Sequence, residues 1–304
     1  KTSEDTWRHE LTHQLFRESG RATNQKAFEN QFIWLDEGIA TYAESTTKNQ
    51  HLFGEFYTLG GFDSRRMQYA RFRRFLENYF IPSKELSDLG RVQLQQRNDL
   101  VKIYSESAGL AEFLMNSERG TLQPKLNQFL KIMYQGKVKP GRFQSEIGKT
   151  FLELDEQYVD FLKIQPSEIT RFLIRPDLKT ELSLPGVNLN LDDFEAIGKC
   201  TKLSWLDLSG SRLPDACFSK LKQCGQLNQL FLNGCQLEEG ALTGISSLPN
   251  LSEVDLSGSS VSNRDLPDLT KARQLKSLNL TRTRITEDGI KLLKKELPNL
   301  NIIQ

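Results

Sequence analysis

The feature that most constrains this chain is a 24-residue period in its C-terminal half. Apolar residues recur at this step in five columns, and each column is filled in five successive repeats. The columns are Leu182, Leu206, Leu230, Val254 and Leu278; Leu184, Leu208, Leu232, Leu256 and Leu280; Leu189, Leu213, Leu237, Val261 and Ile285; Phe194, Phe218, Leu242, Leu266 and Ile290; and Ile197, Leu221, Ile245, Leu269 and Leu293. One such unit cannot bury its apolar face alone, but stacked neighbours close a continuous core. The period therefore predicts a repeat array.

Each repeat reads L-x-x-L-x-L-x-x-(S/C/T)-x-L, as in residues 203–213 and 275–285. The alternating L-x-L stretch predicts a short strand with one buried face. The pattern resembles the leucine-rich-repeat family over roughly residues 178–304. The resemblance implies an α/β solenoid of about five 24-residue repeats that serves protein binding or substrate recruitment. Ile302 falls on the next step of the first column, so we expect the array to end with the chain.

The first half of the chain has helical spacing and no repeat. We expect helices over residues 64–80, 107–116, 122–134 and 151–163. Two prolines, at positions 166 and 176, mark the segment between the halves. The overall prediction is an α+β protein with a mostly helical domain over 1–163, a linker over 164–180 and the repeat domain over 181–304.

Charge and hydropathy exclude two classes of partner. The 304 residues carry a net charge of only +1, so no global field draws the chain to nucleic acid. No run of 18 apolar residues occurs, so we expect no transmembrane helix. The arginines of the 64–80 segment are expected on a solvated helix face: Arg65, Arg66, Arg71, Arg73 and Arg74.

The motif that carries chemistry is "HELTH" at residues 9–13. On a helix, His9 and His13 lie about 6 Å apart on one face and can share a metal ion. Glu10 is rotated by about 100° from His9, which places its carboxylate beside the ion, where a general base for water belongs. The motif therefore predicts a zinc site that needs a third protein ligand, and the alternative for this motif alone is an ordinary polar surface helix.

A second motif, "FIWLDEGIATYAE" at residues 32–44, follows in the sequence. Together the two motifs are similar to the gluzincin zinc metallopeptidases of the aminopeptidase-N type. The resemblance implies one Zn²⁺ ion, His9, His13 and Glu37 as its ligands, Glu10 as general base, and hydrolysis of a peptide or protein substrate. The alternative for Glu37 is a salt bridge to a surface arginine. Between His13 and Glu37 lie 23 residues, enough to end one helix near Gly20 and return on a second.

Further residues have candidate roles around the proposed zinc ion. Tyr104 stands 67 residues after Glu37, and the resemblance implies that it donates to the oxyanion. "YSES" replaces the family's usual Y-E-K-G string here, and the alternative is a tyrosine packed at a helix start. Thr41 and Glu44 are candidates to bind the second nitrogen of a ligand histidine, and the alternative is that either is an ordinary polar helix residue. His51 is expected in a loop or on the surface, since a catalytic zinc site keeps one position open.

The start of the chain raises a separate expectation. Gluzincins carry a β-sheet before the H-E-x-x-H helix, and only eight residues precede His9 here. The chain begins with Lys1 and shows no signal peptide, so we expect it to be processed or cut from a longer product. The resemblance implies a bacterial protein outside the cytoplasm, while endo- and exopeptidase activity both stay open.

The repeat strands predict a concave face with five candidate protein-binding residues: Trp205, Asp207, Phe231, Glu253 and Asp255. Exposed aromatic residues flanked by acids are typical of a binding hot spot. The alternative is that Trp205 and Phe231 dock the repeats onto the helical domain. The four cysteines, all between positions 200 and 235, are expected to be buried free thiols. A non-catalytic scaffold that acts through the repeats is the second function open at this point.

Overall fold

The computed structural model describes residues 3–19, 28–51, 54–60, 64–164, 169, 173 and 175–304. The chain divides into two units, Lys1–Lys163 (unit 1) and Ile164–Gln304 (unit 2). Among the described residues, no helix is both long enough and apolar enough to cross a membrane.

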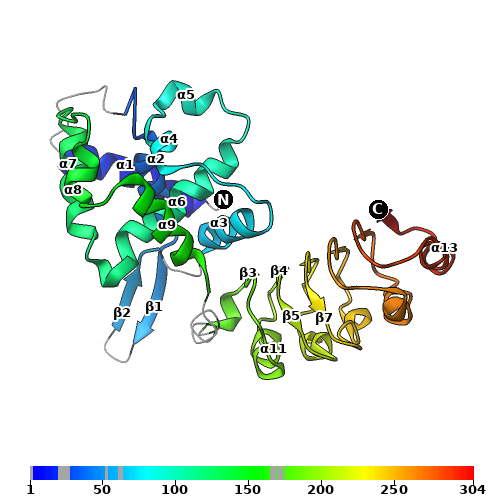
Figure 1. Cartoon of the computed structure of the whole chain (residues 1–304). Helices are drawn as coiled ribbons and strands as arrows, with labels where there is room; N and C mark the ends of the chain where they lie inside the picture. The colour runs from blue at the N-terminus through cyan, green and yellow to red at the C-terminus, as the bar shows by residue number, and fades with distance from the viewer. Residues whose placement is uncertain are drawn as a thin grey trace. The chain divides into compact units, whose positions relative to one another are not determined.

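Unit 1 is built mainly of helices (Figure 1). α2 packs against α1 and α6, and α6 also packs against α3, α7 and α9. The helices are α1 (Ser3–Ser19), α2 (Ile33–Glu44), α3 (Arg65–Phe75), α4 (Ser83–Ser87), α5 (Arg91–Gln95), α6 (Leu100–Asn116), α7 (Gln123–Tyr134), α8 (Arg142–Ile147) and α9 (Phe151–Leu162). A short 3₁₀ helix, η1 (Ser117–Gly120), follows α6.

The helix α2 is buried on all sides, and its buried residues include Asp36 and Glu37 among mostly apolar side chains. Every residue from Ile33 to Tyr42 is buried. A methyl group added at Gly38 would lie 2.5 Å from the main-chain oxygen of Ser107 in α6, so only glycine permits this approach. Trp34, at the start of α2, donates from Nε1 to Ser87 Oγ at 3.1 Å. These contacts fix the helix that carries Glu37.

Unit 1 departs from the sequence predictions in its only described strands, which form an antiparallel hairpin. β1 (Thr47–His51) pairs with β2 (Gly54–Thr58). The sequence predicts a loop or surface position for His51, but the residue ends β1. The segment "TKNQH" has no apolar alternation, so periodicity could not indicate a strand.

The basic segment of α3 also differs from its prediction. Arg71 is fully buried, and its Nε donates to the Leu162 carbonyl at 3.1 Å. Arg73 donates to the Val101 carbonyl at 2.6 Å and to Ser105 Oγ at 2.5 Å. The prediction of a solvated face is therefore wrong for these two arginines, which tie α3 to its neighbours. α3 also ends at Phe75, earlier than predicted, and Asn78 then takes a left-handed conformation.

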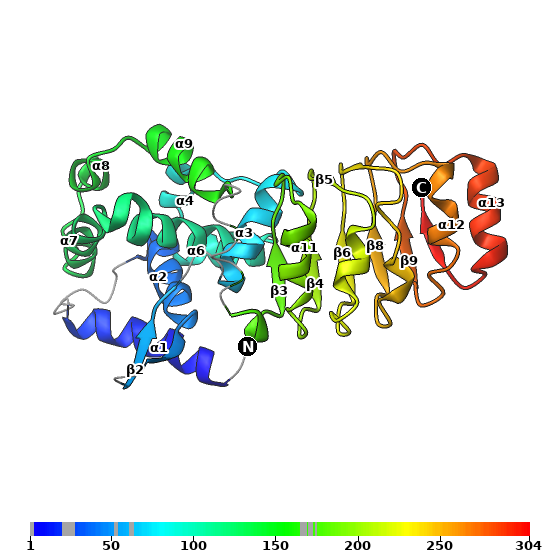
Figure 2. The ribbon, with the colours of Figure 1, turned by 90° about the horizontal axis from the view of Figure 1, so that it is seen from below.

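Unit 2 is a stack of 24-residue repeats with one six-stranded parallel sheet, in the order β10-β9-β8-β6-β4-β3. Its strands are β3 (Glu181–Ser183), β4 (Trp205–Asp207), β6 (Gln229–Phe231), β8 (Glu253–Asp255), β9 (Ser277–Asn279) and β10 (Asn301–Ile303). A smaller pair joins β5 (Arg212–Leu213) to β7 (Gln236–Leu237). Figure 2 shows β3, β4, β6, β8 and β9 side by side in sequence order.

The register of this sheet follows the sequence period. Leu182 pairs with Leu206, and Leu206 with Leu230, so successive strands match residues 24 positions apart. Ile302 pairs with Leu278, which confirms its place on the next step. The helical parts of the repeats are η3 (Pro176–Leu178), α11 (Leu191–Gly198), η4 (Cys217–Leu221), η5 (Ile245–Ser247), η6 (Asn263–Asp265), α12 (Leu266–Leu269) and α13 (Glu287–Glu296).

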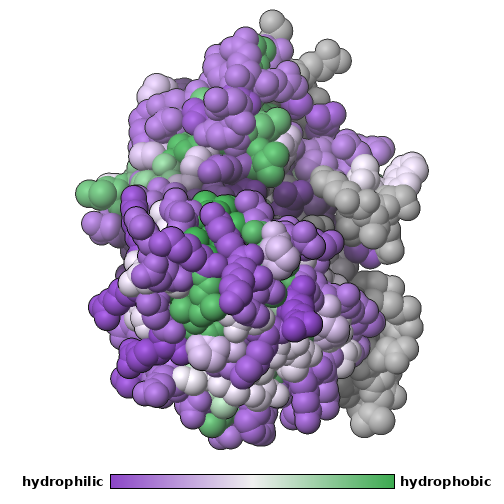
Figure 3. All heavy atoms as spheres, turned by 90° about the vertical axis from the view of Figure 1, so that its right-hand side faces the viewer, coloured by the Kyte–Doolittle hydropathy of each residue, from purple (hydrophilic) through white to green (hydrophobic). Residues whose placement is uncertain are grey.

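The repeat core contains the predicted columns. Leu184, Leu208, Leu232 and Leu256 are fully buried, and Phe194 and Phe218 pack edge to face behind them. All four cysteines are free and buried in this unit. On the face drawn in Figure 3, hydrophilic side chains dominate and apolar ones form scattered patches.

Candidate metal centre

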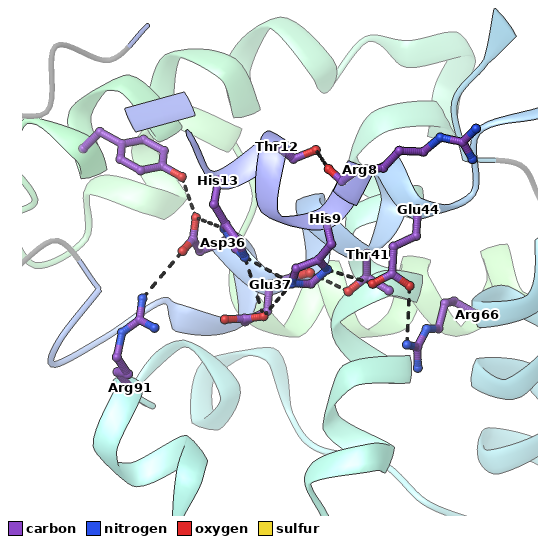
Figure 4. Close-up of polar contacts among 11 residues, drawn as sticks. Arg8, His9, Thr12, His13, Asp36, Glu37, Thr41, Glu44, Arg66 and Arg91 are labelled. Atoms are coloured by element: carbon purple, nitrogen blue, oxygen red, sulfur yellow. Dashed lines mark hydrogen bonds and ion pairs between the residues drawn. The ribbon is translucent and has the colours of Figure 1, made fainter. Parts of the chain in front are cut away.

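The histidines of α1 and the glutamate of α2 converge at one point (Figure 4). His9 Nε2 and His13 Nε2 lie 3.2 Å apart. Glu37 Oε2 lies 3.4 Å from His9 Nε2 and 3.9 Å from His13 Nε2. The side chains of His9, His13 and Glu37 are only 10%, 12% and 12% exposed. The structure thus brings together the three residues predicted to bind zinc.

The spacing of these three atoms fits a small divalent cation. Ligand atoms held about 2.0–2.1 Å from one zinc ion at tetrahedral angles lie about 3.3 Å from one another. The separations here, 3.2, 3.4 and 3.9 Å, are close to that value. Two imidazoles and one carboxylate also form a donor set that zinc accepts, with a fourth position left for water. The residues therefore fit the implied metal.

A second carboxylate orients His9. Glu44 Oε1 lies 2.7 Å from His9 Nδ1, so the carboxylate can accept a hydrogen bond from that nitrogen and leave Nε2 facing the centre. Burial alone would lower the pKa of His9, but hydrogen bonds to Glu37 and Glu44 outweigh it and raise the pKa to about 9. The site is therefore electronegative and favours a cation. Glu44 is one of the two residues that the sequence suggests for this role.

The other candidate for that role, Thr41, binds elsewhere. Its hydroxyl donates to the main-chain oxygen of Glu37 at 2.6 Å. The prediction that it binds a ligand histidine is therefore wrong. One helical turn separates the two residues, and a buried threonine on a helix commonly satisfies its hydroxyl in this way.

Asp36 faces His13, an arrangement absent from the sequence prediction. Asp36 Oδ1 lies 3.2 Å from His13 Nδ1 and accepts a hydrogen bond from the Tyr134 hydroxyl. Burial would raise the pKa of Asp36, but His13 and Tyr134 lower it below its ordinary value. Each ligand histidine is thus paired with a carboxylate. The signal in the sequence was the acid directly before Glu37 in "WLDEG".

Of the two proposed catalytic residues, Glu10 lies between the two ligand histidines in the sequence and Tyr104 lies after Glu37. Glu10 is exposed and follows His9 on α1. Tyr104 is half-buried in the second turn of α6, later in the helix than the sequence indicates. Burial and the Glu37 carboxylate, to which the Tyr104 hydroxyl donates, raise the pKa of Tyr104 to about 12. The phenol is therefore neutral at physiological pH and can donate a hydrogen bond.

Two of the five candidate binding residues of unit 2 are buried. Trp205 is only 6% exposed and Asp207 is fully buried, so the prediction that both are exposed is wrong. Asp207 accepts hydrogen bonds from the hydroxyls of Ser183 and Ser209, both at 2.6 Å. A carboxylate between two strands thus supports the sheet instead of facing a partner.

The remaining residues of that face are more accessible. The half-buried ring of Phe231 lies 5.6 Å from that of Trp205. Glu253 is exposed and accepts a hydrogen bond from Gln229 at 2.7 Å. Asp255 is half-buried and accepts hydrogen bonds from the Ser257 amide and the Asn279 side chain.

Comparisons with known proteins give little beyond this geometry. No protein-family model matches the chain, and no curated protein matches it. A leucine-rich-repeat protein from Leptospira interrogans is similar at 19% identity, with 47% of this chain and 40% of that chain covered and a TM-score of 0.34. An internalin from Listeria monocytogenes is similar at 18% identity, with coverage of 43% and 48% and a TM-score of 0.24. The chain spans less than half the length of either, so the architecture of unit 2 rests on its own strand pairing.

Proposed function

We propose that unit 1 is a zinc-dependent peptidase. The observation that carries the proposal is the convergence of His9, His13 and Glu37 from two helices, with ligand atoms 3.2–3.9 Å apart. The resemblance of both motifs to gluzincin metallopeptidases supports the same reaction. When bound, zinc would lower the pKa of a water molecule to about 7 and polarise the substrate carbonyl.

Glu10 is the proposed general base. Its place beside His9 on α1 puts an exposed carboxylate next to the ligand cluster. Such a group takes a proton from the attacking water and then delivers it to the leaving amine. Because Glu10 is not one of the three converging ligands, its loss should affect turnover without removing the metal.

Tyr104 is the proposed donor to the oxyanion that develops on the substrate carbonyl. Its neutral hydroxyl donates a hydrogen bond to Glu37, so it lies beside the proposed ligand cluster. A neutral donor in a partly buried site stabilises developing negative charge more than the same donor in bulk water.

The test separates metal binding from turnover. We expect His13→Ala and Glu37→Gln to lose zinc, whereas Glu10→Gln keeps zinc and loses about 10²–10⁴-fold in turnover. Glu18→Gln is the matched control, because Glu18 is exposed on the same helix and binds Gln14 at 2.9 Å. Elemental analysis gives the zinc content, and a peptide library gives the cleavage rate. Full activity in Glu10→Gln would refute the assignment.

A protein-binding scaffold is the second candidate function, and the repeats favour it. Unit 2 presents a continuous sheet whose accessible side chains, such as Glu253 and Gln229, are polar, and such sheets form extended binding surfaces. Under this reading the zinc site has a structural role. Bound zinc together with no cleavage of any library peptide would favour the scaffold over the peptidase.

A further inference from the structure

Two arginines from separate elements flank the ligand cluster. Arg66, in α3, has Nη2 3.5 Å from Glu44 Oε2, and Glu44 is the carboxylate that orients His9. Arg91, at the start of α5, has Nη2 4.0 Å from Asp36 Oδ2, and Asp36 is the carboxylate that faces His13. Figure 4 shows the two guanidinium groups on opposite sides of the cluster. Two positive charges thus bracket the proposed site of cleavage.

The contacts of both arginines are too long for tight structural pairs. A well-formed arginine–carboxylate pair has two hydrogen bonds of about 2.7–2.9 Å. Arg97 shows this geometry in the same unit, with Nε and Nη2 at 2.8 and 2.9 Å from the two oxygens of Asp99. Arg66 reaches its carboxylate only at 3.5 Å and Arg91 only at 4.0 Å.

Both guanidinium groups retain donors for another acceptor. A guanidinium carries five N–H donors, and within the described part of the chain Arg66 and Arg91 each make one ion-pair contact. Their side chains are 24% and 42% exposed. Solvent, and hence a solute, can therefore reach both groups.

Both arginines lie one carboxylate away from a proposed ligand histidine. Arg66 contacts Glu44, which lies 2.7 Å from His9 Nδ1, and Arg91 contacts Asp36, which lies 3.2 Å from His13 Nδ1. A peptide held at the ligand cluster would therefore bring its neighbouring side chains near the two arginines.

We propose that Arg66 and Arg91 bind substrate carboxylates on either side of the scissile bond, so that unit 1 selects acidic peptides. This inference rests on the proposed peptidase function and names its substrate class. Without these arginines, the carboxylates of Asp36, Glu44 and Glu10 would repel an acidic peptide. The carboxylate can come from an aspartate or glutamate side chain or from a free C-terminus, because a guanidinium binds either in the same geometry.

The experiment measures binding in zinc-loaded Glu10→Gln protein, so that turnover does not interfere. The probes are two dye-labelled octapeptide pools, identical except for Glu or Gln at the positions that flank a random central pair. Each pool is made with a free and with an amidated C-terminus. We expect the Glu pool to bind at least about tenfold tighter, which is about 1.4 kcal/mol. Equal binding of the amidated and free forms assigns the effect to side chains, and tighter binding of the free form assigns it to the terminus.

Variants of the two arginines test the assignment. We expect Arg66→Gln and Arg91→Gln each to reduce the Glu preference several-fold, and the double variant to abolish it. Arg142→Gln is the matched control, since Arg142 is a partly exposed arginine of unit 1 that pairs with Glu146. Arg91→Glu should shift the preference toward a pool with Lys at the same positions. Retained zinc in each variant shows that the site is still folded.

Two results would overturn the inference: equal binding of Glu and Gln pools, or a Glu preference that survives the double variant. A different result would refute the peptidase proposal itself, namely the absence of zinc-dependent cleavage by the unaltered protein. Cleavage with equal kcat/KM for Glu and Gln substrates would leave the peptidase standing and remove the selection of acidic peptides.

Discussion

His9 contacts two carboxylates of the candidate site, those of Glu37 and Glu44, and the contact with Glu44 carries a prediction. Glu44→Gln removes the negative charge 2.7 Å from His9 Nδ1, so His9 becomes a weaker and less well oriented ligand. We expect zinc affinity to fall about 10–100-fold, measured by competition with a chromogenic chelator. Thr41→Val is the control, because that hydroxyl donates to the main-chain oxygen of Glu37 and, among the described residues, makes no hydrogen bond to a histidine. Unchanged affinity in Glu44→Gln would contradict the role.

Glu106 carries a pH prediction away from the metal ligands. It is 1% exposed, its Oε1 has no hydrogen-bond partner among the described residues, and burial raises its pKa to about 8. The folded state therefore favours the protonated form. Below a pH of about 4.5, the pKa of this glutamate in the unfolded chain, the carboxyl is neutral in both states and does not lower the free energy of unfolding. Between pH 4.5 and 8 the unfolded chain loses the proton while the folded protein keeps it, so the free energy of unfolding falls as the pH rises. Above pH 8 both states are ionised and this contribution is constant.

Glu106→Gln keeps a neutral group at this position at every pH. We expect the difference in unfolding free energy between variant and parent to grow in favour of the variant between pH 5 and 8, by up to about 1.4 kcal/mol per pH unit. Urea unfolding with a chelator present measures this difference. Asp160→Asn, at an exposed acid of the same unit, should show no such trend. A difference that is independent of pH would show that Glu106 is charged in the folded protein.

The residues of the candidate centre differ in how far the sequence could predict them. His9, Glu10, His13 and Glu37 stand in local motifs whose spacing is tied to helix geometry. Arg66 and Arg91 reach the centre only because α3 and α5 lie near it, and nothing in their local sequence indicates this. Trp205 has the spacing of an exposed strand residue, and its burial depends on contacts that no local pattern contains.

At the scale of elements, the contact between α2 and α6 carries the geometry of the centre. Gly38 follows Glu37 directly, and an added Cβ would lie 2.5 Å from Ser107 O and 3.3 Å from Ala111 Cβ. We expect Gly38→Ala to push the helices apart, destabilise unit 1 by about 1–3 kcal/mol and weaken zinc binding. Chemical denaturation and chelator competition measure the two effects.

The control for that variant is Gly225→Ala in unit 2, where an added methyl meets nothing within 4 Å. It should leave both stability and zinc affinity nearly unchanged. If Gly38→Ala bound zinc as tightly as the parent, the close approach of α2 and α6 would have no part in placing Glu37.

Elements with strong periodicity were predictable, and short or polar ones were not. The predicted helices over 122–134 and 151–163 match α7 and α9 closely, because apolar residues recur there at helical spacing over three turns. The five-residue helices α4 and α5 are too short to show a period. In the repeats, the helical segments range from the three-residue η5 to the ten-residue α13 although the period is constant, so the period alone does not predict their length.

At the scale of the whole molecule, the two units differ in how sequence order maps onto contacts. In unit 2 each strand pairs with the next strand of the 24-residue series, so the period alone predicts the strand order of the main sheet. In unit 1, α2 packs on α6, which begins 56 residues after the last residue of α2. No local signal encodes such a partner, so the sequence predicted helices in unit 1 but not their packing.

The repeat register predicts which deletions unit 2 tolerates. Removing residues 229–252 deletes one whole period and places Glu253 where Gln229 stood, with every column preserved. We expect this protein to fold with one strand fewer in the main sheet, without β7, and with reduced stability, because each repeat contacts mainly its neighbours. Removing only residues 229–240 shifts all later columns by half a period and should unfold the repeats. Circular dichroism and thermal melting distinguish the outcomes, and equal melting of the two proteins would contradict the register.

The position of the four cysteine thiols has a practical consequence. All four thiols belong to unit 2, and burial raises the pKa of Cys200 to about 11 and those of the other three to about 12. A dye that reacts with thiolates can therefore modify these cysteines only when local or global unfolding of unit 2 exposes them to solvent. The labelling rate therefore reports on unfolding of the repeats alone. The candidate metal ligands of unit 1 are histidines and a glutamate, which do not react with such a dye.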